Sequence, residues 1–495
     1  MSNFVTEYTT PSGFKLNLNT ALFINNEFVA GGSTIDTINP VNGEVIATVQ
    51  AAEKEQVDLA VEAAEKAFYG GWKKSTGRER ARLMNKLADL CERDAEELAQ
   101  IETLDNGKPL TNSRMVDVQI IVTQLRYFAG WCDKIHGKVI ETEGKLSYTV
   151  HEPIGVCGGI IPWNLPMGML SWKIAPAVAT GNTVVIKTSE LTPLSAIKVA
   201  ALVKEAGFPP GVINIITGYG HITGDALARH MKVSKIAFTG SLAIGRQIMR
   251  ASADSNLKKV TLELGGKSPN IVFDDVENLD EVVFWSRMGI FFNAGQACCA
   301  GSRIFVQEGI YDKFVEKFKA LAASGKVGDP LEADTFQGPQ ISQRQFDRVM
   351  DYIKAGKEEG ATCLLGGNRV GDTGYFIEPT IFTDVTPKMK IMQEEIFGPV
   401  VCISKFTDID DVVKKAHDTI YGLAAAVFTS NITRAVTLSN ELEAGTVWVN
   451  CYNIINENSP FGGYKQSGQG RENSEYALAN YTQVKAIKIN VGNPL

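Results

Sequence analysis

The chain has 495 residues, 44% of them hydrophobic and 21% charged, so it is long enough for two or three domains with large buried cores. Its 56 acidic residues outnumber its 49 Lys and Arg residues, which argues against a surface built to neutralise nucleic-acid phosphates. No apolar run reaches the roughly eighteen residues that a membrane span requires. We therefore expect neither a nucleic acid nor a membrane as a partner.

The cysteines and the N-terminus indicate a cellular compartment. Eight cysteines are spread along the chain without the spacing of a disulfide framework or a CxxC metal site. The first residues, MSNFVTEYTTPSGFKLNLN, contain Glu7, no Arg, and no apolar core behind a basic segment. We expect reduced thiols, no metal site and a cytoplasmic location.

The first third of the chain carries helical patterns. Apolar residues recur at helical spacing from Lys54 to Phe68. A second helix is expected to begin with Thr76 and Glu79 in capping-box register. These patterns predict that the first 130 residues are largely helical.

From residue 154 onward, short runs rich in Val and Ile alternate with amphipathic helical segments. The runs are IGVCGGIIP, NTVVIK, VINIITG, KIAFTG and VTLELGG. Such alternation is typical of βαβ units, with a parallel sheet covered by helices on both faces, and predicts a Rossmann-like domain. After Ser302 a second series, SRIFVQ, VVCISKF, LAAAVFTS and GTVWVN, predicts a second α/β domain.

Two strand-like segments fit neither domain. Residues 145–150 (KLSYTV) and 486–491 (AIKINV) alternate apolar with polar side chains. An uncovered strand edge invites pairing, so we expect an arm that another subunit covers. The alternative is that both segments pack within one chain.

Two glycine-containing motifs fail as nucleotide signatures. The segment GGKS at 265–268 ends like a P-loop, but Thr261 stands where the pattern needs a glycine, which removes the best support for ATP or GTP binding. The segment GYGHITG at 218–224 has Thr223 in place of the third glycine of GxGxxG and reads as a structural turn.

The segment FTGSLAIG at 238–245 is better placed to bind a phosphate. It follows a predicted strand and begins a predicted helix, so Gly240 and Gly245 allow the start of the helix to approach an anion. The alternative reading is a simple helix cap.

The stretch FNAGQACCAGSRIF contains two adjacent cysteines. If it is extended, Cys298 and Cys299 point to opposite sides, so at most one faces a given cleft. Its small neighbours favour access for a substrate, while the alternative is a buried and inert thiol. None of the five histidines completes a recognisable Cys-His hydrolase motif.

Glu263, flanked by leucines at a predicted strand end, is either a desolvated general base with a raised pKa or an exposed charge.

The chain contains six motifs that occur together in one family: GQACCAGSR, LELGGKSP, PWNLP, FTGSLAIG, EEIFGPV and SPFGGYKQSGQGRE. In order and spacing they resemble the NAD(P)-dependent aldehyde dehydrogenase superfamily, in particular its acetaldehyde- and retinal-type branch. The resemblance implies an NAD-binding domain at 1–134 and 154–265 and a catalytic domain at 266–466. It also implies a small β oligomerisation arm at 135–153 and 480–495, in a homotetramer built as a dimer of dimers.

By this resemblance, an aldehyde is oxidised to the carboxylic acid through a covalent thiohemiacetal and thioester. Cys298 is then the nucleophile and Cys299 a bystander, while Glu263 activates the hydrolytic water. Asn164 stabilises the oxyanion together with the backbone N–H of Cys298. The family places two further residues near a proton-relay path, which are Lys173 and Glu472.

The resemblance also assigns the cofactor contacts. Lys187 and Glu190 match contacts to the adenosine ribose, and a carboxylate there repels a 2′-phosphate, so NAD is favoured over NADP. The other predicted cofactor contacts are Trp163 on the adenosine side, Gly240, Ser241 and Gly245 at the pyrophosphate, and Glu395 with Phe397 at the nicotinamide ribose.

The predicted substrate tunnel consists of Leu165, Met169, Trp172, Phe292, Ile455 and Phe461. It contains no Arg or Lys to pair with a carboxylate on the substrate, so apolar aliphatic or aromatic aldehydes such as acetaldehyde are favoured. We expect about a third of these six side chains to be core residues only. The alternatives are a CoA-acylating or a semialdehyde-specific dehydrogenase, a cysteine hydrolase, and a non-catalytic structural protein.

Overall fold

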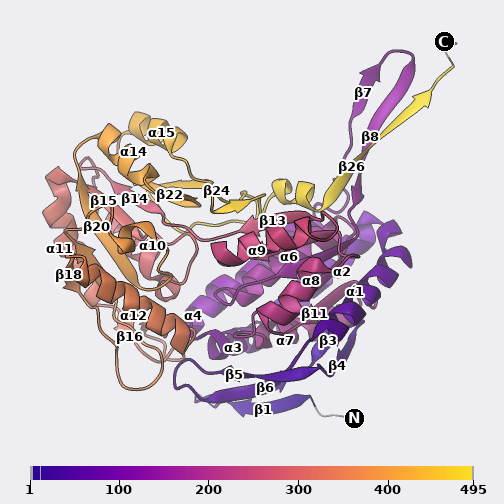
Figure 1. The fold of residues 1–495 in the computed structure, drawn as a ribbon, viewed down its shortest axis with the longest axis horizontal. Helices are drawn as coiled ribbons and strands as arrows, with labels where there is room; N and C mark the ends of the chain where they lie inside the picture. The colour runs from indigo at the N-terminus through magenta and orange to yellow at the C-terminus, as the bar shows by residue number, and fades with distance from the viewer. Residues whose placement is uncertain (1–3, 12, 493–495) are drawn as a thin grey trace.

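The computed structural model describes residues 4–11 and 13–492, which form two large sheets with covering helices and one projecting arm (Figure 1). Residues 1–3, at the start of the predicted NAD-binding domain, and residues 493–495, at the end of the predicted arm, lie outside this range. No helix in the described part of the chain combines the length and apolar character needed to cross a bilayer.

The N-terminal segment differs from the prediction, because strands occupy it up to Ala51. They are β1 (Val5–Thr9), β2 (Lys15–Asn19), β3 (Leu22–Ile24), β4 (Glu27–Val29), β5 (Ser33–Ile38) and β6 (Val45–Ala51). β1 pairs with β2 and β5 with β6 as antiparallel hairpins. The prediction of a largely helical segment is wrong here, since such short strands each carry only two or three inward-facing side chains.

The helices of the first third are α1 (Lys54–Tyr69), α2 (Gly77–Arg93), α3 (Ala95–Asn106), α4 (Leu110–Asn112), the π-helix η2 (Ser113–Asp117) and α5 (Val118–Ala129). Of these, α1 and α2 begin where the sequence predicts helices, and no bounds were predicted for the others. At the start of α2 the Thr76 hydroxyl accepts a hydrogen bond from the Glu79 backbone N–H at 3.2 Å. The predicted N-cap is therefore confirmed.

The first large sheet has the strand order β25-β13-β12-β9-β10-β11-β3-β4. Its parallel strands are β9 (Val156–Ile160), β10 (Thr183–Lys187), β11 (Ile213–Ile216), β12 (Lys235–Thr239) and β13 (Lys259–Glu263), and the short β25 (Gly468–Gln469) pairs antiparallel at the edge. The intervening helices are α6 (Pro166–Ala179), α7 (Leu194–Ala206), α8 (Asp225–Arg229) and α9 (Leu242–Ala253). Val184 and Val185, neighbours in β10, belong to different buried clusters, so both faces of the sheet are covered as predicted.

The second large sheet has the order β18-β19-β20-β15-β14-β22-β23 and is parallel except for β18. Its strands are β14 (Pro269–Val272), β15 (Arg303–Gln307), β18 (Thr362–Leu365), β19 (Thr380–Thr383), β20 (Val400–Phe406), β22 (Ala424–Phe428) and β23 (Thr446–Val449). Its helices are α10 (Leu279–Phe291), α11 (Tyr311–Ala323), α12 (Gln343–Glu358), α14 (Ile409–His417) and α15 (Ile432–Glu441). The second α/β unit expected from the sequence is present.

The arm consists of β7 (Val139–Thr142), β8 (Lys145–Pro153) and β26 (Thr482–Asn490), in the order β26-β8-β7. It projects away from the helices, and the turn between β7 and β8 lies beside the end of β26 (Figure 1). Both predicted strands exist, and they pair antiparallel with each other within the chain. Val139 and Val484, on the two outer strands, remain largely exposed.

Candidate active site

A cavity of about 590 Å³ lies at the carboxyl ends of β9, β12 and β13 and reaches α10, α12 and residues 452–461. Ligand sites in open α/β sheets form at this edge. The predicted residues that line the cavity are Asn164, Glu263 and Cys298; Trp163, Gly240, Ser241, Glu395 and Phe397; and Leu165, Met169, Trp172, Phe292, Ile455 and Phe461. The predicted residues outside its lining are Lys173, Glu472, Lys187, Glu190 and Gly245.

The two adjacent cysteines lie in a turn. The Ala300 backbone N–H donates to the Ala297 carbonyl at 3.1 Å, which closes the turn over Cys298 and Cys299. The stretch is not extended at the two cysteines, so the argument that sends them to opposite sides does not apply, and both residues are among those that line the cavity. Chain reversal in a turn removes the alternation on which that argument depends.

The Cys298 thiol is half-buried and carries a raised pKa. Contact with the Cys299 thiol raises this pKa most, followed by burial and the negative charges of Glu263 and Glu395. Cys299 is buried, and its Sγ donates to the Asn453 side-chain oxygen at 3.4 Å. Because a thiolate is the reactive form, the charge state of Cys298 depends on its immediate neighbours.

Asn164 lies in the loop between β9 and α6, with its side chain directed at the cysteine loop. Its Nδ2 donates to the Gln296 carbonyl at 3.0 Å, and the residue is buried at the cavity wall. An amide nitrogen carries two hydrogens, so one remains for a further acceptor. The backbone N–H of Cys298 has no hydrogen-bond acceptor among the residues that the structure describes.

Glu263 is the last residue of β13 and is 4% exposed. Its Oε2 atom has no hydrogen-bond partner within the described ranges. Burial raises the pKa of Glu263 well above its ordinary value, and the charge of Glu472 adds to the rise, while Lys173 and Arg471 oppose it. The alternative of an exposed strand-end charge is therefore wrong, and the environment suits a general base.

Lys173 in α6 and Glu472, which follows β25, form a buried ion pair outside the cavity lining. The Lys173 Nζ lies 2.5 Å from Glu472 Oε1, and Glu472 Oε2 has no partner in the part of the chain that is described. Both charges act on Glu263, in opposite directions. Their pairing thus sets the electrostatic environment of that carboxyl.

Lys187 and Glu190 lie at the same sheet edge, beyond the cavity. Lys187 ends β10 opposite Ile160 of β9, and its Nζ contacts Glu190 Oε2 at 2.9 Å. Burial lowers the pKa of Lys187, and Glu190 opposes that shift. The Glu190 side chain is one third exposed and can accept hydrogen bonds from a ligand.

The start of α9 combines a helix cap with part of the cavity wall. The Ser241 hydroxyl accepts from the Ile244 backbone N–H at 3.4 Å, and Ser241 and Gly240 both line the cavity. Gly245 instead faces Leu264, whose side chain would lie 2.8 Å from an added Cβ, so its small size serves packing of helix against strand. Sequence reasoning missed Thr239, a cavity residue whose buried hydroxyl has no partner among the described residues.

Glu395, Phe397 and Trp163 also line the cavity. The Trp163 and Phe397 rings meet edge to face, with centroids 5.2 Å apart. Glu395 Oε1 accepts from the Gly266 backbone N–H at 3.3 Å, and burial raises the pKa of Glu395 to about 7. A side chain at Gly265 would collide with the Glu395 carboxylate, so the glycine pair of LELGG is needed for this approach.

All six predicted tunnel residues line the cavity, so the expectation that a third are core residues only is wrong. Trp172 and Phe461 pack edge to face at 5.4 Å. Sequence reasoning missed further lining residues, namely Met115, Val116, Gln119, Ile120, Trp285, Met288, Gln345, Arg348, Asn453 and Glu457. The one-turn spacing of Met115, Gln119 and Thr123 was the available signal. Met115 lies in the π-helix η2, which is not readable from sequence, and Gln119 and Thr123 lie in α5.

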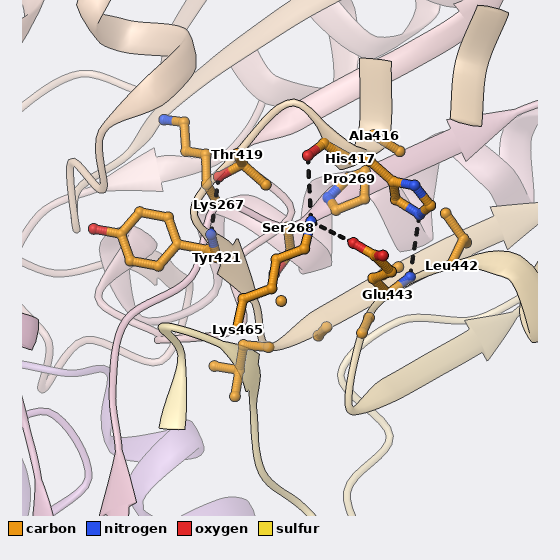
Figure 2. Close-up of a pocket in the computed structure, with 15 residues that line it drawn as sticks. Lys267, Ser268, Pro269, Ala416, His417, Thr419, Tyr421, Leu442, Glu443 and Lys465 are labelled. Carbon is orange, nitrogen blue, oxygen red and sulfur yellow. Dashed lines mark hydrogen bonds and ion pairs between the residues drawn. The ribbon is translucent and has the colours of Figure 1, made fainter. Parts of the chain in front are cut away.

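The GGKS segment borders a different and very small pocket of about 10 Å³, room for about one water molecule. Figure 2 shows Lys465 reaching across it to the Glu443 carboxylate, 2.7 Å away, and to the His417 carbonyl. A nucleotide does not fit in this volume.

Within residues 4–11 and 13–492, no group of three His, Cys, Asp or Glu side chains is arranged to hold a metal ion.

Comparison with known proteins agrees with this geometry. The model of the aldehyde dehydrogenase family matches residues 28–487. The chain is 60% identical over 490 residues to an aldehyde dehydrogenase of Alternaria alternata, with 98% of each chain covered. It is 54% identical over 475 residues to the mitochondrial aldehyde dehydrogenase of Homo sapiens, covering 95% of this chain and 92% of that protein. The solved NAD⁺ complex of a Bacillus cereus aldehyde dehydrogenase superposes with a TM-score of 0.94 at 49% identity, covering 96% of this chain and 97% of that one. The chain therefore belongs to the aldehyde dehydrogenase family, whose members oxidise aldehydes to acids with NAD or NADP.

Proposed function

We propose that this protein oxidises apolar aldehydes to carboxylic acids through a covalent intermediate on Cys298, with NAD preferred over NADP. The observation that carries the proposal is that Cys298, Glu263 and Asn164 line one cavity whose exposed surface is mainly apolar. Nucleophile, base and oxyanion donor are the three parts that acyl chemistry at a carbonyl requires.

The residues present fit a dinucleotide. The Thr239 hydroxyl, which has no partner among the described residues, and the start of α9 after Ser241 offer hydrogen-bond donors and a positive dipole end to a pyrophosphate. The Gly240 backbone N–H already donates to the Glu263 carbonyl, so Gly240 contributes its small size. Glu190 would hold the adenosine ribose, Trp163 would lie on the adenosine side, and Glu395 with Phe397 would hold the nicotinamide ribose. When bound, the cofactor accepts the hydride that leaves the substrate carbon.

Cys298 Sγ, as the thiolate that remains once the thiol proton has passed to water, attacks the carbonyl carbon. The carbonyl π electrons move onto the oxygen and give a tetrahedral thiohemiacetal anion. The oxyanion accepts the free hydrogen of the Asn164 amide and the backbone N–H of Cys298, neither of which has another acceptor within hydrogen-bonding reach among the described residues. One such donor contributes roughly 3 kcal/mol to the transition state.

After oxidation the substrate is a thioester on Cys298. Glu263 takes a proton from a water molecule, which attacks the thioester and releases the acid. The raised pKa of Glu263 makes its carboxylate a stronger base than an exposed one, and the Lys173–Glu472 pair lies beside it to receive or return the proton.

The substrate class follows from the tunnel. Its six predicted residues are apolar, and the nearest cation lining the cavity, Arg348, donates to the Glu395 backbone carbonyl at 2.9 Å. A carboxylate-bearing semialdehyde would lack a free counter-ion among the tunnel residues. Glu263 favours water over CoA as the acceptor.

We further propose the predicted domain boundaries, a homotetrameric assembly through the arm, and a cytoplasmic location. The uncovered edges of β7 and β26 support pairing with other subunits. Light scattering would measure the mass, and a monomeric protein would contradict the assembly.

The test of the function is absorbance at 340 nm with acetaldehyde, longer aliphatic aldehydes and benzaldehyde, using NAD or NADP. We expect NADH to form without CoA and more efficiently than NADPH. A requirement for CoA would instead support an acylating enzyme. Mass spectrometry during turnover should find the acyl group on Cys298, and an adduct elsewhere would overturn the mechanism.

A further inference from the structure

The loop that carries Cys298 begins with two residues in the left-handed region. Asn293 has φ 50° and ψ 38°, and Ala294 has φ 54° and ψ 34°. Asparagine tolerates this region, but alanine adopts it only where surrounding contacts hold it. The Ala294 carbonyl accepts from the Gln340 side chain at 3.2 Å, which is one such contact. The two residues turn the chain from the end of α10 back toward the cavity.

The left-handed turn places the Asn293 side chain against the loop of Asn164. Asn293 is 2% exposed, and its Nδ2 donates to the Asn164 carbonyl at 3.0 Å. The Asn164 Nδ2 in turn donates to the Gln296 carbonyl at 3.0 Å. Gln296 completes a ring of hydrogen bonds that joins Asn293, Asn164 and Gln296. Its backbone N–H and its Nε2 donate to the Asn293 carbonyl at 3.0 and 3.2 Å.

The ring joins the oxyanion donor to the nucleophile's own loop. Gln296 lies two residues before Cys298, and its Oε1 accepts from the Ile341 backbone N–H at 3.0 Å, which fixes that side chain as well. On the far side of the Asn164 loop, the Asn106 Nδ2 donates to the Trp163 carbonyl at 2.7 Å. The loop is thus held from two directions, by α3 and by the cysteine loop.

We propose that Asn293 is a positioning residue that fixes the Asn164 amide relative to the Cys298 thiol. This inference rests on the proposed function, because it assigns Asn293 a role only through the oxyanion donor. Asn293 itself does not line the cavity, so it acts without touching the substrate. Preorganised donors stabilise a transition state because they need no rearrangement when charge develops.

The test is a double-mutant cycle between Asn293 and Asn164. Asn293→Gly keeps the left-handed backbone accessible and removes the donor, so kcat for acetaldehyde should fall roughly tenfold to a hundredfold while KM changes by no more than about twofold. In the Asn164→Ala background the same substitution should lower kcat by less than about twofold, since the group on which it acts is gone.

Ala294→Gly is the matched control, because it lies beside Asn293 in the same conformation and keeps every donor of the ring. It should retain kcat within about twofold of wild type. If Asn293→Gly does not fold, as judged by thermal unfolding, Asn293→Ala replaces it, since alanine lacks the donor and the neighbouring Ala294 already adopts the same left-handed conformation.

Two outcomes overturn the positioning role. One is an unchanged kcat in the Asn293 variant, and the other is an equal loss of kcat in the wild-type and Asn164→Ala backgrounds. A wild-type protein that forms no NADH with any aldehyde would overturn the proposed function as well, so the two failures are distinguishable in the same set of measurements.

Discussion

Lys173 Nζ lies 2.5 Å from the Glu472 carboxylate, and this buried pair acts on Glu263 with opposing charges. Removing one member should therefore move the pKa of Glu263 in a direction that identifies the member removed. Glu472→Gln removes a negative charge that raises the pKa of Glu263, so the rise of kcat with pH should shift to lower pH. Lys173→Met removes a positive charge that lowers the pKa of Glu263, so the rise of kcat should shift to higher pH.

The measurement for the Lys173–Glu472 pair is kcat against pH for both variants and wild type. Each variant also leaves an unpaired buried charge, so we expect a loss of about 3 to 5 kcal/mol in the free energy of unfolding. Glu152→Gln breaks an exposed ion pair with Lys485 and serves as the control. Shifts in the same direction in the two variants would contradict the electrostatic account.

Activity should increase as pH rises above the ordinary pKa of a glutamate and continue to increase above the ordinary pKa of a thiol. The pKa values of Glu263 and Cys298 are both raised, so the free protein holds a neutral carboxyl and a neutral thiol below those values. Both groups act in their deprotonated forms, which become populated only as pH rises. Initial rates from pH 6 to 9 would test this. Glu263→Gln should lose the part of the pH dependence that comes from hydrolysis of the thioester, while it still accumulates the acyl enzyme.

Cys299→Ala should make Cys298 more reactive toward alkylating agents. Contact with the Cys299 thiol is the largest cause of the raised pKa of Cys298, so its removal should lower that pKa. The measurement is the rate of alkylation by iodoacetamide as a function of pH. Cys451→Ala, at a half-buried cysteine outside the cavity lining, should leave the profile unchanged.

Asn164→Ala should lower kcat roughly a hundredfold to a thousandfold, because it removes one of two oxyanion donors. The KM for the aldehyde should change little, since the donor acts mainly on developing charge. Steady-state kinetics with acetaldehyde decide the matter. A loss confined to KM would show that Asn164 binds the ground state instead.

Glu190→Gln should narrow the preference for NAD over NADP. It removes a carboxylate that repels a 2′-phosphate, an effect of about 1 kcal/mol, or roughly fivefold, for a side chain in contact with solvent. The ratio of kcat/KM values for the two cofactors is the readout. An unchanged ratio would place the discrimination elsewhere.

The sequence predicted the elements that are regular and buried. Strands β9 to β13 are continuous apolar runs because helices cover both of their faces, and such runs are readable without a structure. The hairpins up to Ala51 were missed although strands such as VTEYT and KLNLN alternate exposed with inward-facing side chains, since strands this short give few repeats of the alternation.

The site was predicted less evenly. Motifs located Cys298, Glu263 and Asn164, but the turn from Ala297 to Ala300 that holds both cysteines, and the left-handed conformation of Ala294 before it, have no signal in residues such as alanine. Asn106 was missed because its partner Trp163 lies far along the chain. Thr239 lies inside the motif FTGSLAIG, but only the glycines and Ser241 of that motif were assigned to a phosphate. Tertiary contacts of this kind are set by the fold and leave no local pattern.

The pairing of β25 with β13 has a consequence for how the protein is made. Leu262 lies opposite Gln469, so an edge strand of the first sheet is supplied after the whole second sheet has been synthesised. The arm likewise joins residues 145–153 to residues 482–490. The nascent chain on the ribosome therefore cannot complete its N-terminal half early, and a fragment ending near residue 265 should emerge with open edges that chaperones have to protect.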